Sequence, residues 1–394
     1  MTTPNDTPLH WVQDALESLD ADGLRRHLRT RCGPQRATIE LDGRSFVHFG
    51  SNDYLGLAAD ARITDAVRDS LATVGWGTGA SPLISGHTDY HKTLENHLAT
   101  FEGTEAACLF VSGFAANAGT IPTLVNASDI IFADSKNHAS LIDACRLSRA
   151  TISIYEHCDV QHLESLLRNA PEARRRLIVT DSLFSMDGDF APLVEIAALR
   201  ERYGCMLLVD EAHATGVFGP NGRGISELLG VESAVDIKVG TLSKAVGCAG
   251  GFVCGSAPLI EWLINRARSY IFSTSHPAAT AAAADAAVQI IQEEPFRRSD
   301  LLAKSTSMRE RLTSQGWDLG TSESQIIPIQ IGSAKRAVAA SRALSEEGFF
   351  VPAIRPPSVP DGECCLRLSV TYDHSEEMLQ AVSDALQSLR SLAV

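Results

Sequence analysis

The sequence lacks the features that mark membrane-spanning, secreted and nucleic-acid-binding proteins. No apolar run approaches the roughly 20 residues of a membrane-spanning helix. The first residues do not combine a basic stretch with an apolar one, so we expect no signal peptide. The 34 basic residues are outnumbered by 48 acidic ones, which gives a net charge of −14. Such a charge argues against sequence-independent binding to nucleic acid or to an anionic membrane.

Cysteine is sparse and carries no sign of a disulfide framework or of a metal site. There are nine cysteines, an odd number, and no two of them form a Cys-x-x-Cys pair. Most lie within apolar segments, as Cys108, Cys205 and Cys254 do. We therefore expect small buried side chains in a reducing compartment, and hence a cytoplasmic protein.

Apolar segments, in contrast, are plentiful and regularly spaced. With 394 residues, 44% of them hydrophobic, the chain can bury a large core. Between about residues 50 and 280, short apolar runs alternate with segments of helical spacing. This alternation predicts an α/β fold, in which a mostly parallel sheet is flanked by helices on both faces. The expected strands are 107–111, 130–132, 152–155, 177–180, 206–209, 237–239 and 252–254.

Three segments are expected along the chain. Residues 1–48 would form an amphipathic N-terminal helix and a polar arm. Residues 49–285 would form the large α/β domain, with an alanine-rich helix at 278–292 leading out of it. Residues 286–394 mix apolar runs with helical patterns, which predicts a small C-terminal α+β domain with strands at 326–331 and 365–370.

The most informative pattern joins Asp210, His213 and Lys244. An apolar run is followed by Asp210-Glu211-Ala212-His213, and a later Gly-containing turn ends in Lys244. A buried carboxylate needs a partner, and the protonated nitrogen of a pyridine ring would be one. A partly desolvated lysine loses its proton easily and becomes an amine nucleophile and base. The pattern predicts a pyridoxal-phosphate enzyme in which His213 reaches the oxygen on the cofactor ring.

A rival interpretation of the same letters comes from a different class of protein. Asp-Glu-Ala-His also spells the DEAH box of NTP-driven helicases, in which the acidic pair serves Mg²⁺ and the nucleotide. That function needs an upstream Gly-x-x-x-x-Gly-Lys-Ser/Thr loop to hold the phosphates. The chain has no such loop, because the stretch 240–244 lacks the glycine spacing and follows the acidic box. The NTPase interpretation is therefore disfavoured.

A phosphate site is expected at Ser112-Gly113-Phe114. These residues follow a predicted strand and open a helical pattern, and a helix start offers free backbone N–H groups to an anion. Ser112 alone could simply cap the helix. Beside Asp210 and Lys244 the phosphate interpretation is favoured, and Thr241 could add a hydroxyl. Ligands of open α/β sheets bind beyond the carboxyl ends of the strands. Because Asp210, the stretch 182–185 and the stretch 112–113 each follow an apolar run, they are expected at one rim.

Two further candidates lie in polar turns. His138 follows a predicted strand, where its flat ring could stack on the cofactor, and Ser185 could hydrogen-bond the same ring oxygen as His213. Each could instead be an ordinary turn residue, and His213 could be a core histidine with satisfied hydrogen bonds.

A cluster of histidines superficially resembles a zinc-binding helix. The spacing is right for two ligands on one face, but there is no His-Glu-x-x-His sequence and no third ligand in context. We therefore expect no metal and a solvated helix start at His87, His91, Glu95 and His97.

Taken together, these residues make the sequence resemble the α-oxoamine synthases, fold-type I pyridoxal-phosphate enzymes that condense an amino acid with an acyl thioester. The resemblance covers nearly the whole chain and is carried by segments 51–57, 112–117, 184–189, 210–216 and 241–244. It implies the fold of that family, pyridoxal 5′-phosphate as cofactor, and a homodimer whose active site is shared between subunits.

The resemblance also implies a role for each cofactor residue. Lys244 would bind the aldehyde of the cofactor and later remove the α-proton of the amino acid. Asp210 would pair with the pyridinium nitrogen, and His138 would stack on the ring. The remaining contacts would come from His213 and Ser185 at the ring oxygen, from Ser112, Gly113, Phe114 and Thr241 at the phosphate, and from Ser273 and Thr274 of a second subunit.

For the substrates, the resemblance implies that Arg367 holds the amino-acid carboxylate with Asn52 nearby, and that Arg25 meets the far carboxylate of the acyl chain. Ser358 keeps a hydroxyl where many members of the family carry threonine. Pro82 stands where many members carry arginine, which removes a cation and a backbone donor. This departure concerns the handling of the thioester rather than the cofactor.

Within the family, the stretches 353–360 and 366–369 resemble the members that condense L-alanine with a pimeloyl thioester and release CO₂ and a thiol. Either coenzyme A or acyl-carrier protein could carry the thioester. The alternatives are sister enzymes that use glycine, namely 2-amino-3-ketobutyrate coenzyme A ligase and 5-aminolevulinate synthase. A non-catalytic regulatory subunit of this fold is a further alternative, but it would not need Lys244.

Overall fold

The computed structural model describes residues 8–391 of the chain. It divides into two compact units. The smaller unit comprises residues up to Ser51, the short segment Met186–Gly188 and the residues from Ala303 onward. The larger unit comprises Asn52–Ser185 and Asp189–Leu302. The expected boundaries at residues 48/49 and 285/286 remain predictions.

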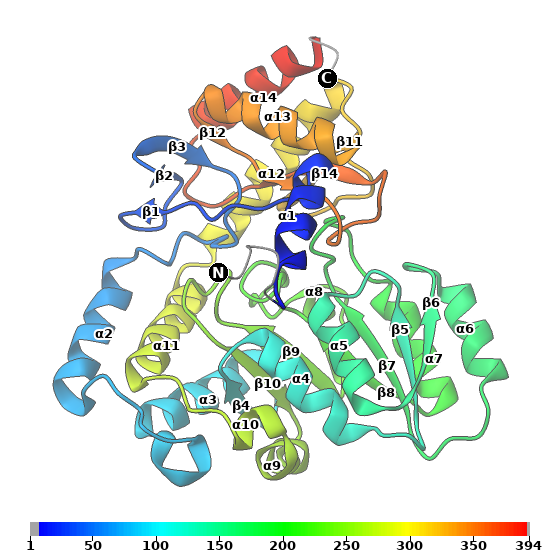
Figure 1. Cartoon of the computed structure of the whole chain (residues 1–394). Helices are drawn as coiled ribbons and strands as arrows, with labels where there is room; N and C mark the ends of the chain where they lie inside the picture. The colour runs from blue at the N-terminus through cyan, green and yellow to red at the C-terminus, as the bar shows by residue number, and fades with distance from the viewer. Residues whose placement is uncertain (1–7, 392–394) are drawn as a thin grey trace. The chain divides into compact units, whose positions relative to one another are not determined.

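The larger unit is built on a seven-stranded sheet with the order β4-β10-β9-β8-β7-β5-β6 (Figure 1). Strand β10 runs antiparallel to both of its neighbours, whereas the pairs from β9 to β6 are all parallel. The predicted mostly parallel sheet is thus confirmed. The strands are β4 (Ala106–Phe110), β5 (Ile130–Asp134), β6 (Thr151–Tyr155), β7 (Arg176–Asp181), β8 (Met206–Asp210), β9 (Ile237–Thr241) and β10 (Gly251–Gly255).

Helices cover this sheet, and several start at side-chain caps that the sequence provides. Ser112 caps α4, Asp159 caps α6 and Ser256 caps α9, each by accepting a backbone N–H three residues further on. Helices α4 and α5 lie side by side (Figure 1). The helical segments of this unit are α2 (Ala61–Val74), η1 (Pro82–Gly86), α3 (Asp89–Glu102), α4 (Gly113–Leu124), α5 (Ala139–Ser148), α6 (Val160–Asn169), α7 (Leu193–Tyr203), α8 (Ile225–Leu228), η2 (Glu232–Ala234), α9 (Ala257–Arg266), α10 (Arg268–Ile271) and α11 (Ala278–Glu293).

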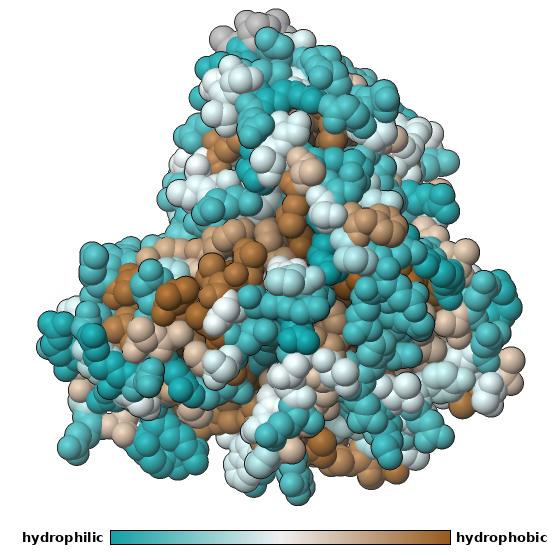
Figure 2. All heavy atoms as spheres, turned by 180° about the vertical axis from the view of Figure 1, so that it is seen from behind, coloured by the Kyte–Doolittle hydropathy of each residue, from teal (hydrophilic) through white to brown (hydrophobic). Residues whose placement is uncertain are grey.

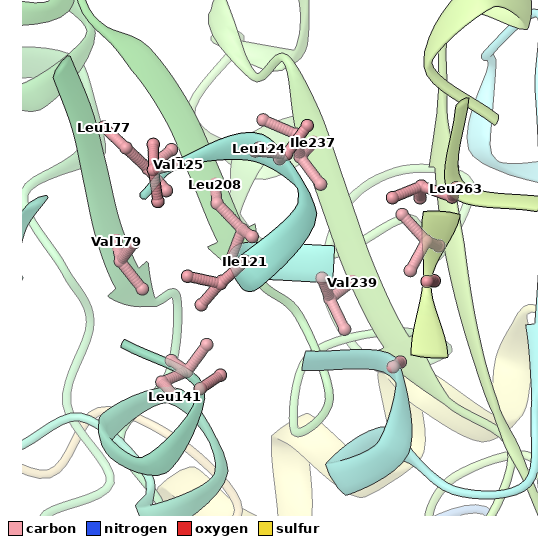
Figure 3. Packing of buried hydrophobic residues seen from close by; sticks show 14 of the residues in the cluster. Ile121, Leu124, Val125, Leu141, Leu177, Val179, Leu208, Ile237, Val239 and Leu263 are labelled. Carbon is pink, nitrogen blue, oxygen red and sulfur yellow. The ribbon is translucent and has the colours of Figure 1, made fainter. Parts of the chain in front are cut away.

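The core of the larger unit lies between α4 and the middle of the sheet. Ile121 of α4 is directed toward Leu208 of β8 and Val239 of β9, and all three side chains are fully buried (Figure 3). This packing holds α4 directly over the strands whose ends carry Asp210 and Thr241.

The smaller unit combines two small sheets with four helices. One sheet has the order β1-β2-β3-β12 and the other the order β11-β14-β13. The C-terminal strands predicted from the sequence are confirmed in β11 and β14, which pair antiparallel. The elements are α1 (Trp11–Ala21), β1 (Arg31–Cys32), β2 (Thr38–Leu41), β3 (Arg44–His48), α12 (Phe296–Ser314), β11 (Ile326–Gly332), α13 (Ala334–Glu346), β12 (Phe349–Phe350), β13 (Ala353–Ile354), β14 (Cys364–Ser369) and α14 (Glu376–Ser391), of which α12 begins in the larger unit.

The surface is largely polar. Hydrophilic residues cover most of the face seen in Figure 2, with apolar patches between them. Six cysteines are buried, as expected, whereas Cys32 is exposed and two others are half-buried. Among residues 8–391, no helix is both long and apolar enough to cross a bilayer.

Candidate functional site

Four strands of the central sheet end in a polar side chain at the same rim. Asp134, Asp181, Asp210 and Thr241 are the last residues of β5, β7, β8 and β9. Because these strands are parallel, their carboxyl ends meet at one edge, which is where open α/β sheets bind ligands. The sequence had placed Asp210 at this rim.

Asp210 is held in place by two hydrogen bonds. Its residue is only 5% exposed. Asn117 Nδ2 donates to Oδ2 at 2.7 Å, and the backbone N–H of Ala212 donates to Oδ1 at 2.9 Å. Asn117 also donates to Ser140 Oγ at 3.0 Å, which links α4 to the start of α5. Sequence analysis named Asn117 only within the segment 112–117. The feature that could have identified it is its position one helical turn after Gly113.

Asp181 is a second buried carboxyl group that sequence analysis missed. Burial raises the pKa of Asp181 well above its usual value, and the nearby charge of Asp210 raises it further. The backbone N–H of His138 donates to Asp181 Oδ2 at 2.7 Å. This bond fixes the loop that carries His138 to the end of the neighbouring strand.

His138 is a neutral imidazole that belongs to the same group of residues. Its Nδ1 accepts the backbone N–H of Ser140 at 3.2 Å, so this nitrogen carries no proton. Burial lowers the pKa of His138, and the charge of Lys244 lowers it further, whereas Asp210 opposes them. The structure therefore brings His138, Asp210 and Lys244 together in one site.

His213 lies in a curled turn directly after Asp210. The backbone N–H groups of Ala214 and Thr215 both donate to Glu211 O at 2.8 Å, which turns the buried His213 side chain toward Tyr54. The distance from His213 Nδ1 to Tyr54 Oη is 2.7 Å, and Tyr54 donates to Asn52 Oδ1 at 3.1 Å. Tyr54 was not singled out from the sequence, although it links two residues that were.

Glu211 has a structural role that does not suit an Mg²⁺ ligand of a DEAH box. It is fully buried. Its carboxylate accepts the Ser182 hydroxyl at 2.5 Å and the backbone N–H groups of Ile225 and Ser226 at 2.9 Å each. These bonds fasten the loop after β8 to the start of α8.

The start of α4 is a narrow cradle beside Thr241. A Cβ on Gly113 would lie 3.4 Å from Thr241 Cβ, and a Cβ on Gly251 would lie 2.5 Å from the Gly113 nitrogen. The Ser112 hydroxyl accepts the N–H of Ala115 at 3.0 Å, so the cap considered from the sequence is present. The free N–H groups of α4 fit an anion such as the phosphate of pyridoxal phosphate. The Thr241 hydroxyl lies beside them but donates to Gly250 O at 2.9 Å.

Lys244 lies in the tight turn between β9 and β10. The Gly247 N–H donates to Lys244 O at 2.8 Å. Gly247 has φ +70°, and a Cβ there would lie 2.5 Å from Ala58 N, so only glycine fits without strain. The lysine side chain is half-buried, in keeping with the predicted partial desolvation.

Ser185 lies at the end of a narrow hairpin after β7. The Phe184 N–H donates to Asp189 O at 3.0 Å, and Leu183 pairs antiparallel with Phe190. Ser185 is half-buried.

The segment with Ser273 and Thr274 lines a small cavity of about 30 Å³ together with Pro82. The Ser275 N–H donates to Ala80 O at 3.1 Å, which holds this segment against the loop before Pro82. Pro82 is the first residue of the short helical turn η1, where a missing N–H breaks no hydrogen bond within the helix.

The remaining predicted substrate residues belong to the smaller unit, and the structure describes only their surroundings within it. Arg367 lies on β14 opposite Pro328 and is 7% exposed. Arg25 forms a half-exposed ion pair of 2.6 Å with Asp20, and Ser358 is exposed.

The predicted solvation of the histidine-rich helix start is wrong for His91. This ring is buried and accepts the Thr88 backbone N–H at Nδ1, 3.2 Å away. Its Nε2 lies 3.0 Å from His276 O. His87 instead pairs with Glu95 at 2.8 Å, and His97 with Asp285 at 2.8 Å. These side chains cap and fasten α3.

Comparison with known proteins gives matches along almost the whole chain. The profile of the family described as aminotransferase class I and II matches residues 44–386. An 8-amino-7-oxononanoate synthase of Anaeromyxobacter sp. (strain Fw109-5) is 50% identical over 382 residues, which cover 97% of this chain and 96% of the relative. That of Geobacter sulfurreducens is 46% identical over 377 residues, covering 95% and 96%.

Solved structures give the same picture of similarity. Serine palmitoyltransferase from S. paucimobilis, bound to a PLP-myriocin aldimine, is 31% identical with a TM-score of 0.93 and 98% of both chains covered. The 8-amino-7-oxononanoate synthase of Francisella tularensis is 28% identical with a TM-score of 0.76, covering 89% of this chain and 99% of that one.

Proposed function

Because the chain belongs to the α-oxoamine synthases, within the aminotransferase class I and II family, we propose that it is an 8-amino-7-oxononanoate synthase of biotin biosynthesis. Its cofactor is pyridoxal phosphate, and its reaction class is acyl transfer. The proposed reaction condenses L-alanine with a pimeloyl thioester and releases CO₂ and the thiol. Its main support is the 44–50% identity with eight synthases of that name over nearly the whole chain.

Asp210 is proposed to pair with the ring nitrogen of the cofactor. When bound, pyridoxal phosphate supplies a protonated aromatic ring that accepts the electron pair left at the α-carbon of the amino acid. The observation that carries this role is the burial of Asp210 at a strand end, in the same group of charges as His138 and Lys244. Asn117 and Ala212 hold the carboxylate in place by hydrogen bonds.

Lys244 is proposed to bind the cofactor aldehyde and to move the proton at the α-carbon of alanine. Its place in a turn enforced by Gly247 supports this role, because the turn limits where the amine can reach. His138 is proposed to stack on the ring as a neutral imidazole. His213 and Ser185 are proposed to contact the ring oxygen, and Tyr54 holds His213 in place for that contact.

The phosphate is proposed to bind at Ser112, Gly113 and Phe114, with the Thr241 hydroxyl beside them. The close approach of Gly251 to Gly113 supports this, because it leaves backbone N–H groups rather than side chains facing the anion. Ser273 and Thr274 are proposed to reach the phosphate of a second subunit, so that the enzyme acts as a homodimer.

The substrates are proposed to be held by charged groups at their ends. Arg367 would bind the α-carboxylate of alanine through a bidentate contact, with Asn52 and Ser358 nearby. Arg25 would meet the distal carboxylate of the pimeloyl chain. The loop at Pro82 is a candidate contact for the thioester, whether coenzyme A or acyl-carrier protein carries it. We propose a cytoplasmic location, supported by the free cysteines that pack as small apolar groups.

The direct test is a substrate panel with the purified, cofactor-loaded protein. Alanine, glycine and serine are each offered with pimeloyl-coenzyme A and pimeloyl-acyl-carrier protein, and CO₂ and free thiol are measured. We expect alanine to be preferred. A preference for glycine would assign the chain to a sister enzyme, and a preference for serine would overturn the proposal as well. Lys244→Ala is the matched inactive control, and borohydride reduction of the unmodified enzyme should place the pyridoxyl group on Lys244.

A further inference from the structure

His157 lies in the turn between β6 and α6, where no role was expected for it. Its side chain is 17% exposed, and its two ring nitrogens face two different carboxylates. Nδ1 lies 2.9 Å from Asp134 Oδ1, and Nε2 lies 3.1 Å from Asp189 Oδ2. The edge of the ring packs against Phe184, with the ring centres 4.4 Å apart and the planes at 89°.

Both contacts of His157 require a proton on the histidine. An ionised carboxylate can only accept, so each ring nitrogen must donate, and an imidazole with two N–H groups is positively charged. Burial lowers the pKa of His157, but the hydrogen bonds to Asp134 and Asp189 outweigh it and raise the pKa to about 12. At neutral pH we therefore expect the ring to be a cation that donates from both nitrogens.

Asp134, the first of the two carboxylates that His157 contacts, is held rigidly in the fold. Asp134 is buried at the end of β5. Besides His157, its carboxylate accepts the backbone N–H of Lys136 at 2.8 Å and that of Cys158 at 2.9 Å. The turn that carries His157 is thus fastened to the end of β5 by the His157 ring and by the Cys158 N–H.

The second carboxylate belongs to the hairpin that carries Ser185. Asp189 stands on the returning arm of this hairpin, opposite Phe184, whose N–H donates to Asp189 O at 3.0 Å. His157 therefore contacts both arms, through the Asp189 carboxylate on one and the Phe184 ring on the other. Ser185 is the residue after Phe184, so the position of its hydroxyl depends on this contact.

We infer that His157 is a positioning residue, a fixed imidazolium that ties the Ser185 hairpin to the end of β5 and thereby sets where Ser185 meets the cofactor. This inference rests on the proposed role of Ser185. The charge matters because an ion pair between buried groups holds a narrower geometry than a neutral hydrogen bond does.

The first test measures whether the His157 ring is positively charged, and it does not depend on enzymatic activity. The full chain, loaded with cofactor, is labelled with ¹⁵N-histidine, and the His157 signals are assigned by their loss in His157→Asn. Both ring nitrogens should keep the chemical shifts of a protonated imidazolium from pH 6 to pH 9. A neutral tautomer or a metal-bound nitrogen in this range would overturn the inference.

The second test asks whether His157 acts through Ser185. His157→Asn, Ser185→Ala and the double variant are compared by kcat, by KM for alanine and by the visible circular dichroism of the bound cofactor. We expect His157→Asn to lower kcat about 10-fold and alter the dichroism, while KM changes less than about twofold. The double variant should be no slower than Ser185→Ala by more than about twofold, because the two changes remove one function.

Two further variants keep this test decisive. His97→Asn changes a histidine that pairs with Asp285 and faces neither carboxylate, and it should leave kcat and dichroism unchanged. If His157→Asn does not fold, Asp189→Asn removes the charge from the hairpin side alone and should give the same dichroism change. If the losses of kcat in His157→Asn and Ser185→Ala add up in the double variant, the inference is overturned. A lower melting temperature of His157→Asn with unchanged kcat and dichroism would overturn it as well. If instead the unmodified enzyme fails to use alanine, the proposed function fails, while the NMR and dichroism results still decide on His157.

Discussion

Asn117 on α4 and Asp210 at the end of β8 are joined by a hydrogen bond of 2.7 Å between Nδ2 and Oδ2, although 93 residues separate them in the chain. The bond connects the helix whose start would hold the cofactor phosphate with the carboxylate that would hold the ring nitrogen. The two ends of the cofactor would therefore be positioned by two elements, α4 and β8, that this hydrogen bond joins.

Asn117→Ala should weaken catalysis without unfolding the protein. A hydrogen bond to a charged group contributes about 1.5–3 kcal/mol, so we expect kcat to fall about 10- to 100-fold. Thr123→Ala, which removes a local hydroxyl bond at the other end of the same helix, is the matched control and should be close to neutral. Steady-state kinetics with alanine measures both. An unchanged kcat in Asn117→Ala would mean that Asp210 needs no support from α4.

Gly251→Ala should weaken cofactor binding. The new Cβ would lie 2.5 Å from Gly113 N and from the Ser112 carbonyl carbon, so the start of α4 must move. Overpacking of this kind costs about 1–3 kcal/mol, and we expect the dissociation constant of pyridoxal phosphate to rise about 5- to 150-fold. Fluorescence titration of the apoenzyme measures it. Gly77→Ala, where a Cβ meets nothing within 4 Å, is the control, and equal affinities in the two variants would contradict the proposed phosphate site.

Arg367→Lys and Arg25→Ala should affect different substrates. Lysine is a point charge and cannot reproduce a bidentate contact, so Arg367→Lys should raise KM for alanine about 10-fold or more and that for the thioester much less. Arg25→Ala should do the reverse. Its partly exposed ion pair with Asp20 contributes little to stability, so the fold should tolerate the change. If acyl thioesters without a distal carboxylate react as well as pimeloyl in the unmodified enzyme, Arg25 has no such role.

His374 should make the protein less stable in mild acid. It is fully buried, stacks on Phe49 with ring centres 4.3 Å apart, and accepts the Thr371 N–H at Nδ1. Burial lowers the pKa of His374 from its usual 6.5 to about 3. Below pH 6.5 the unfolded chain therefore binds a proton at His374, whereas the folded chain does not. The contribution of His374 to stability is fully present above pH 6.5 and is lost progressively as the pH falls toward 3.

Urea unfolding between pH 6.5 and 5 measures this effect. The contribution of His374 should be about 1–2 kcal/mol over that range. His374→Asn, which keeps an acceptor for the Thr371 N–H, should be less stable at pH 7 but should lose less stability on acidification. An identical pH dependence in the two proteins would show that His374 is protonated in the folded state.

The sequence alone determined the features that depend on neighbours along the chain. Apolar runs and helical spacing predicted the strands of the central sheet, because each run must be buried and each helix must cover it. The segment from Asp210 to His213 and the turn at Lys244 indicated pyridoxal-phosphate chemistry. A carboxylate after a buried strand and a lysine in a tight turn are both local patterns. The helix cap at Ser112 could also be predicted, since the N–H that it accepts belongs to Ala115, three residues away.

Only the tertiary structure decided which distant groups meet. Asp181 lies opposite Asp210 because β7 and β8 pair in that register, and no local pattern gives a register. Tyr54 meets His213 across 159 residues, and His157 meets Asp134 and Asp189 from a turn that reads as an ordinary connection. His91 looked solvated because its spacing is helical, but packing against His276 buried it. The physical reason is common to all of these: burial and charge pairing depend on what the other elements place nearby, whereas helix and strand formation depend mainly on the residues themselves.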